Sequence, residues 1–331
     1  MIHYITHRLL VMIPTLFVVS ALVFIIIELP PGDFLSTTIA ELEAQGEAGE
    51  EQLAYYTKLY GLDQPAITRY FRWVGGMLEG DFGYSFEYQK PVREVVGDRM
   101  WLTVLISFTT LLFVYIVAFP IGIYSAVRQY SIGDYTLTFL GFLGLAVPNF
   151  LLALILMYFA KSWFGTEIGG LMDQHLIGEP WSWEKFRSVL AHLWVPVIVI
   201  GTSGTAGMIR RLRANLLDEL HKQYYITARA KGLHPLKALL KYPLRMSLNP
   251  FIADIGSVLP EIISGSAIVS VVLSLDTTGP LLLQALISQD TYLAGSFLMF
   301  LASLTVIGLL VSDLLLSLLD PRIRLGAQGG G

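Results

Sequence analysis

Six long apolar stretches recur along this chain of 331 residues. The hydrocarbon core of a bilayer is about 30 Å thick, and a helix needs about 20 mostly apolar residues to cross it. Each stretch is long enough, so each is predicted to be a membrane-spanning helix. The six predicted spans are Leu9–Leu29, Trp101–Val127, Leu137–Ala160, Val189–Ile209, Leu248–Leu275 and Tyr292–Leu319.

The composition agrees with a membrane protein. Hydrophobic residues make up 54% of the chain and charged residues only 15%, whereas soluble domains carry about 25% charged residues. The alternative is a large soluble protein with apolar helices, but the core of a soluble protein of this length could not bury so many hydrophobic residues. The net charge of −4 predicts no nucleic-acid partner. There is no cysteine, which excludes disulfides and thiolate sites. We expect no metal, no cofactor and no catalytic residue.

Basic residues set the expected orientation. Nine Lys and Arg residues lie between Arg210 and Arg245, and cytoplasmic loops are enriched in these residues. That segment is therefore predicted to be cytoplasmic, and six spans then place both termini in the cytoplasm. The fold class predicted is an all-α polytopic membrane protein with a sizeable outer loop between the first two spans.

The predicted spans divide the chain into four parts. Residues 1–30 hold the cytoplasmic start and the first span, and residues 31–100 form the outer loop. Residues 101–325 form a five-helix core that contains the cytoplasmic loop 210–247, and residues 326–331 are a flexible tail. The outer loop carries aromatic runs such as Tyr70–Trp73. These runs predict either a small folded cap or only an aromatic belt at the membrane interface.

The cytoplasmic loop carries strong turn signals. Thr227–Lys231 favours a helix, and Gly232 suits the position just after its end. Pro235 then suits the first turn of a second short helix. The apolar residues of this second helix are expected to share one face: Leu236, Leu239, Leu240 and Leu244. Either a rigid elbow that contacts a partner protein or a basic amphipathic helix on anionic lipid fits these signals.

The loop segment Thr227–Leu233, with the sequence Thr-Ala-Arg-Ala-Lys-Gly-Leu, resembles the coupling-loop signature of ABC importer permeases. The resemblance is to the dipeptide, oligopeptide and nickel branch of bacteria and archaea. It continues in order along the chain in four further motifs, Gly61–Pro65, Gly80–Ser85, Ala146–Phe150 and Leu319–Arg324.

The resemblance implies a permease subunit in the inner (plasma) membrane of a prokaryote. Its partners would be a second homologous permease subunit, two cytoplasmic ATPase subunits and an extracytoplasmic solute-binding protein, and import would proceed by alternating access. No Gly-Lys dipeptide occurs, so a phosphate-binding P-loop is absent and the partner subunits would hydrolyse ATP. The residues implied to dock on the ATPase are Thr227, Ala228, Arg229, Ala230, Lys231, Gly232 and Leu233.

Some positions depart from the family pattern. Gln223 stands where the family often has Asp, and Ile226 where it often has a basic residue. Leu275–Pro280 replaces a Trp-Pro-Gly-Leu-Gly-like turn that is common in the peptide branch. Peptides and oligosaccharides therefore both remain open as substrates.

Carboxylates at membrane depth mark a candidate translocation path. Asp254 and Glu261 are seven residues apart, which places them about two turns apart on one helix face with Val258 between them. A carboxylate at this depth is costly unless it faces water or a partner. Asp254, Val258 and Glu261 therefore predict a wall of the path. A local partner, a protonated carboxyl, or a position close enough to the interface to be wetted explains the two carboxylates equally well.

Two other function classes compete with an importer subunit. An ion-coupled secondary transporter would relay a proton or sodium ion through Asp254 and Glu261, but such proteins more often have inverted repeats and about ten or more spans. An intramembrane enzyme would need paired carboxylates, or a serine with a base, at one depth on facing helices. Asp254 and Asp313 could be forced into that role, but no motif supports it. The sequence favours the ABC importer permease.

Overall fold

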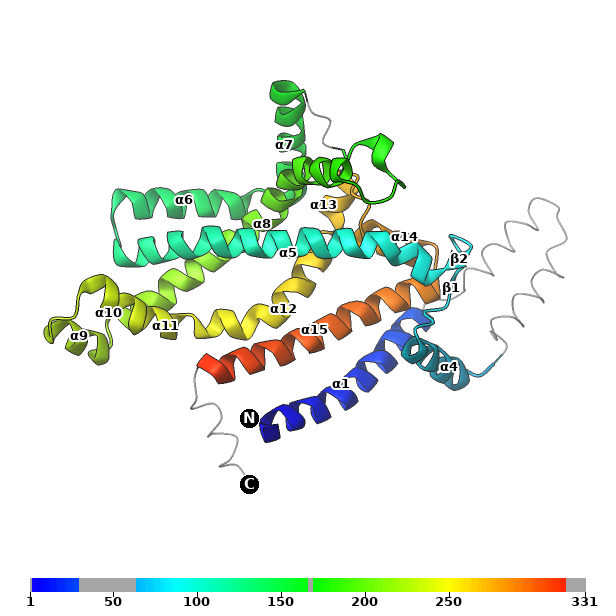
Figure 1. Cartoon of the computed structure of the whole chain (residues 1–331), viewed down its shortest axis with the longest axis horizontal. Helices are drawn as coiled ribbons and strands as arrows, with labels where there is room; N and C mark the ends of the chain where they lie inside the picture. The colour runs from blue at the N-terminus through cyan, green and yellow to red at the C-terminus, as the bar shows by residue number, and fades with distance from the viewer. Residues whose placement is uncertain (1, 30–63, 166–168, 320–331) are drawn as a thin grey trace. The chain divides into compact units, whose positions relative to one another are not determined.

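The computed structural model describes residues 2–29, 64–165 and 169–319, and most of these are helical (Figure 1). Two compact units form, one of Val104–Asp276 with the chain from Ile307, the other of Ile2–Thr103 with Thr277–Val306. The elements are α1 (Ile2–Glu28), α4 (Ala66–Glu79), β1 (Tyr84–Ser85), β2 (Lys90–Pro91), α5 (Val92–Val127), α6 (Ile132–Ala146), α7 (Asn149–Phe164), the 3₁₀ helix η1 (Gln174–Leu176), α8 (Trp183–Leu220), α9 (Gln223–Ala230), α10 (Pro235–Lys241), α11 (Pro243–Ser247), α12 (Asn249–Gly265), α13 (Ala267–Val272), α14 (Thr278–Ile287) and α15 (Thr291–Leu319).

The described helices confirm an all-α membrane protein with several spans. Four of them, α1, α5, α8 and α15, are long and apolar enough to cross a bilayer, and a bent pair makes five. These four contain nearly all of the first, second, fourth and sixth predicted spans. The total of six spans stays a prediction.

The third predicted span is not one continuous helix. It consists of α6 and α7, whose axes are bent by 102°. Pro148 lacks an amide hydrogen and disfavours helical backbone angles in the residue before it. Val147 is accordingly extended, with φ −85° and ψ 121°. The prediction of a single helix over Leu137–Ala160 is therefore wrong, and the break falls at the proline.

The fifth predicted span is divided between α12 and α13. Only Ser266 separates the two helices, and its backbone angles are still helical, with φ −80° and ψ −11°. The Ser266 amide donates to the Ile262 carbonyl at 2.9 Å, and the Ser270 amide donates to the Ser266 carbonyl at 2.8 Å. α12 and α13 are therefore consecutive helices, and together they cover most of the predicted span Leu248–Leu275.

The first unit is built around α8. Leu212 and Leu216 of α8 are fully buried, and Leu212 packs with Val114 of α5 and Phe251 of α12. The helices α6, α7 and α11 also contact α8. Buried residues recur along α8 from Lys185 to Leu216. Because so much of its surface is covered by other helices, α8 is the core of the unit.

The helices α12 and α15 meet backbone to backbone in the first unit. A side chain at Gly256 would overlap the backbone of Gly308, and the reverse also holds. The Gly256 amide donates to the Ser312 hydroxyl at 2.8 Å. Small residues allow this close approach between helices in a membrane.

The second unit attaches α4 to α1 and the hairpin to α15. Tyr70 and Trp73 are buried, and the Tyr70 hydroxyl hydrogen-bonds Ser20 of α1 at 2.8 Å. Asp290, which is fully buried before α15, accepts a hydrogen bond from Ser85 at 2.5 Å. Burial raises the pKa of Asp290 above its usual value, although the hydrogen bonds that it accepts oppose this shift. Residues 31–63 of the predicted cap lie outside the described residues, so the cap stays a prediction.

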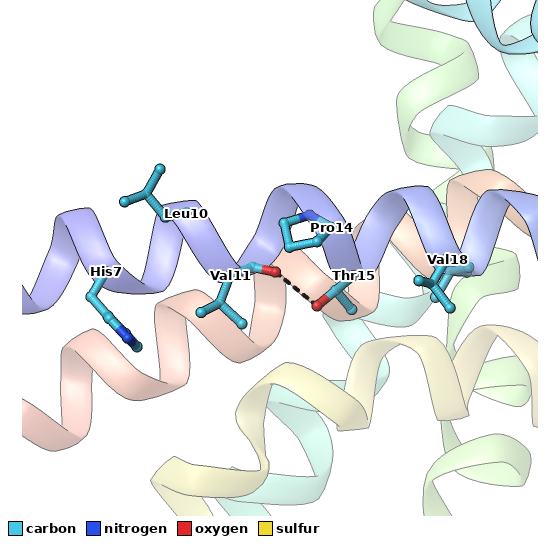
Figure 2. A pocket seen from close by; sticks show the side chains of 7 residues that line it. His7, Leu10, Val11, Pro14, Thr15 and Val18 are labelled. Atoms are coloured by element: carbon cyan, nitrogen blue, oxygen red, sulfur yellow. Dashed lines mark hydrogen bonds between the residues drawn. The ribbon is translucent and has the colours of Figure 1, made fainter. Parts of the chain in front are cut away.

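One face of α1 is apolar and open. Residues of this helix line an open groove of about 470 Å³, and Figure 2 shows their side chains. Pro14 has no amide hydrogen to donate within the helix, and the Thr15 hydroxyl donates to the Val11 carbonyl at 2.8 Å (Figure 2). Leu10 and Val18 beside them are 62% and 55% exposed. An outward apolar surface of this kind is expected of a helix that contacts lipid.

Candidate functional site

The predicted cytoplasmic loop begins as a helix. The span predicted to end at Ile209 continues as α8 to Leu220, about three further turns. Leucine and alanine in this extension are strong helix formers, and Leu212 and Leu216 anchor it in the core. Of the predicted loop 210–247, the first part is thus an arm of α8, and α9, α10 and α11 form the rest.

The elbow between α9 and α10 has the predicted geometry. Gly232 follows the end of α9 with a φ of +80°. The Gly232 amide donates to the Arg229 carbonyl at 3.0 Å, and the Leu233 amide donates to the Ala228 carbonyl at 3.2 Å. This arrangement is typical of helix ends closed by a left-handed glycine. Pro235 is the first residue of α10, as predicted.

The apolar face predicted for the second short helix is wrong at Leu244, which belongs to the separate helix α11. Leu236, Leu239 and Leu240 all lie in α10 at helical spacing. Of these, Leu239 is buried and packs near Leu216 of α8, whereas Leu236 and Leu240 are 56% and 54% exposed. The interruption falls at Pro243, which has no amide hydrogen to donate to the carbonyl one turn earlier.

The seven residues implied to dock lie together at this elbow. Thr227–Ala230 form the last turn of α9, and Lys231–Leu233 form the bend after it. None of the seven is buried, and neither is any other residue of α9. A short helix that presents its surface in this way is available to another protein.

Tyr224 connects α9 to the end of α8. Its hydroxyl donates to the carboxylate of Glu219, and its ring lies 6.3 Å from the ring of Tyr242. Partial burial raises the pKa of Tyr224, and the hydrogen bond to Glu219 and the charge of Glu219 raise it further. The phenol therefore keeps its proton and remains a donor.

Two arginines connect the C-terminal part of α8 to neighbouring helices. Arg213 donates two hydrogen bonds to Asp134 of α6, at 2.9 and 3.1 Å, and only 2% of the Asp134 side chain is exposed. Arg211 pairs with Asp254 of α12 at 2.6 Å, and these side chains are 51% and 39% exposed. No local sequence pattern identifies either pair, because the partners lie 79 and 43 residues apart along the chain.

The structure gives the three path residues different environments. The local partner that the sequence left open exists for Asp254, since Arg211 pairs with it. Val258 is half-buried and Glu261 is exposed, while Ile263 on the same helix is 2% exposed. Asp254 and Glu261 therefore lie on the more open side of α12, whereas Val258 is half-buried like most residues of this helix.

Comparison with known proteins identifies the family. Residues 118–325 match the family described as the binding-protein-dependent transport system inner membrane component, and residues 1–109 match its N-terminal membrane component. The oligopeptide transport system permease protein AppB of Bacillus subtilis is 34% identical, over 97% of this chain and 99% of its own. The dipeptide transport system permease protein DppB of Escherichia coli K12 is 28% identical, over 98% and 99%. The inner membrane ABC transporter permease protein YejB of Escherichia coli O157:H7 is 30% identical, over 97% and 98%. The chain therefore belongs to the family of binding-protein-dependent inner membrane components, and it is a permease subunit of an ABC importer.

Proposed function

We propose that this subunit imports peptides and that the elbow between α9 and α10 docks on a cytoplasmic ATPase. The observation that carries the docking proposal is the unburied turn Thr227–Leu233, fixed in shape by Gly232. The names of the similar permeases, which transport oligopeptides and dipeptides, favour peptides over oligosaccharides.

The proposed assembly has this chain, a second homologous permease subunit, two ATPase subunits and an extracytoplasmic solute-binding protein. ATP-driven closure of the ATPases would move the two elbows together. Contacts that span the short joint between α8 and α9 would pass this movement to α8, which would tilt with the helices packed on it. This change would alternate the path between inward-open and outward-open states.

The proposed topology has six spans with both termini in the cytoplasm. In it, α6 with α7 forms the third span and α12 with α13 the fifth. The basic residues between Arg210 and Arg245 support a cytoplasmic position for the elbow.

Cysteine labelling tests this topology, because the chain has no cysteine of its own. Ser85 and Ser247 are 0% and 1% exposed and are unsuitable, whereas Gln174 and Lys237 are exposed. In intact cells, an impermeant maleimide is expected to label Gln174→Cys but not Lys237→Cys, which should react only after permeabilisation. Labelling of Lys237→Cys in intact cells would invert the topology.

The same assay tests the proposed path along α12. A carboxylate at membrane depth needs water or an opposite charge, and we propose that Asp254, Val258 and Glu261 line a wetted surface. Cysteines at these three positions are expected to react faster than one at the buried Ile263. Trapping the ATP-bound state should change their rates. Equal rates at all four positions in both states would exclude α12 from the path.

A further inference from the structure

The joint between α8 and α9 consists of His221 and Lys222. His221 follows the last residue of α8 with angles that are still helical, φ −90° and ψ −2°, whereas Lys222 precedes α9 with extended backbone angles, φ −73° and ψ 144°. One backbone hydrogen bond, from the Lys222 amide to the Glu219 carbonyl at 3.3 Å, spans the turn. A joint of this kind would let α9 swing without moving α8 unless another contact held the two helices together.

Leu239 of α10 packs near Leu216 of α8 beyond the joint, and Tyr224 supplies a contact across the joint itself. The Glu219 carboxylate belongs to the last turn of α8, and the Tyr224 hydroxyl that donates to it belongs to the first turn of α9. Hydrogen bonds to an ionised acceptor are stronger than those between neutral groups. The hydroxyl thus bridges the two helices directly.

The ring of Tyr224 makes a second connection. It lies 6.3 Å from the ring of Tyr242, which occupies the break between α10 and α11. The ammonium group of Lys241 lies 5.3 Å from the centre of the Tyr242 ring. Tyr224 therefore contacts α8 through its hydroxyl, and through its ring it contacts Tyr242 at the end of α10.

We propose that Tyr224 is a positioning residue that makes α8 follow α9 when the ATPase moves the elbow. This inference rests on the proposed docking of the elbow. Tyr224 acts through Glu219 and contacts neither ATP nor the substrate. From α8, the movement continues through Arg213 to α6 and through Arg211 to α12, the two ion pairs of the inner arm.

The test uses the complete importer, with its ATPase and binding-protein subunits, in proteoliposomes. Tyr224→Phe removes the hydroxyl and keeps the ring against Tyr242. Import and ATP hydrolysis are measured in the same vesicles. We expect ATP hydrolysis close to the wild-type rate, and import per ATP lowered about fivefold, as for loss of one partly exposed hydrogen bond to a charged group.

The neighbouring tyrosine provides a matched control. The hydroxyl of Tyr225 has no hydrogen-bond partner among the residues that the structure describes, so Tyr225→Phe should leave import per ATP unchanged. Glu219→Ala should reproduce the loss seen in Tyr224→Phe. The double variant should lose no more than either single variant, because both remove the same bond.

The outcomes separate this inference from the proposed function. Wild-type import per ATP in Tyr224→Phe would overturn the inference, and so would additive losses in the double variant. A parallel fall of import and ATP hydrolysis would also overturn it, since that result indicates a structural role. Wild-type vesicles that import without ATP would instead contradict the proposed function itself.

Discussion

Replacement of Gly232 by valine is expected to abolish retention of the ATPase subunit and to lower ATP-driven import at least about tenfold. Gly232 has a φ of +80°, and no atom lies within 4 Å of the position a side chain would take. The cost is therefore conformational: a β-branched residue is strongly disfavoured at positive φ, by about 1–3 kcal/mol. Relief of this strain would break the bond from the Leu233 amide to the Ala228 carbonyl and reorient the docking turn.

The matched control for this variant is Gly80→Val. Gly80 ends α4 with a φ of +83° and also has open space around it, so the backbone strain is similar but lies far along the chain from the elbow. Co-purification of the ATPase with each variant is the measurement. Wild-type co-purification and import in Gly232→Val would contradict the docking proposal, and an equal loss in both variants would show that strain alone, wherever it lies, weakens assembly.

Replacement of Arg213 by glutamine is expected to destabilise the permease by about 3 kcal/mol. Asp134 is 2% exposed and receives two charge-assisted hydrogen bonds from Arg213. Without the guanidinium, its buried charge keeps neutral donors, such as the Tyr130 amide at 2.9 Å. The loss should appear as a lower midpoint of thermal unfolding for the purified permease.

Arg211→Gln is the control on the same helix. The pair of Arg211 and Asp254 is 51% and 39% exposed, and exposed ion pairs contribute about 0–1 kcal/mol. Its unfolding midpoint should therefore stay near that of the wild type. If the two variants unfold at the same temperature, burial does not govern the strength of these pairs. A low midpoint in Arg211→Gln alone would place Asp254 in lipid or protein, and not on a wetted path.

Local chemistry made the elbow predictable from the sequence. Gly232 and Pro235 act through their own backbone restrictions, so their structural roles depend little on the rest of the fold. The ion pair of Arg213 with Asp134 is different, because its partners are 79 residues apart. Only the packing of α6 on α8 brings them together, and no local pattern encodes that packing.

Two sequence predictions, the single helix over Leu137–Ala160 and the leucine face through Leu244, fail at a proline. Pro148 signals a break, but the angle of 102° between α6 and α7 depends on how both helices pack on α8. Pro243 ends α10, but the predicted leucine face includes Leu244 beyond the proline. A periodic pattern predicts a shared face only while the helix continues, and a proline interrupts the helix.

Import by the reconstituted complex tests the central claim most directly. Proteoliposomes that contain this permease, its partner subunits and the binding protein are supplied with a labelled peptide. The account predicts accumulation only when ATP reaches the ATPase subunits, with none driven by a proton or sodium gradient. Accumulation driven by a gradient in vesicles that lack the ATPase would contradict the account and identify an ion-coupled transporter.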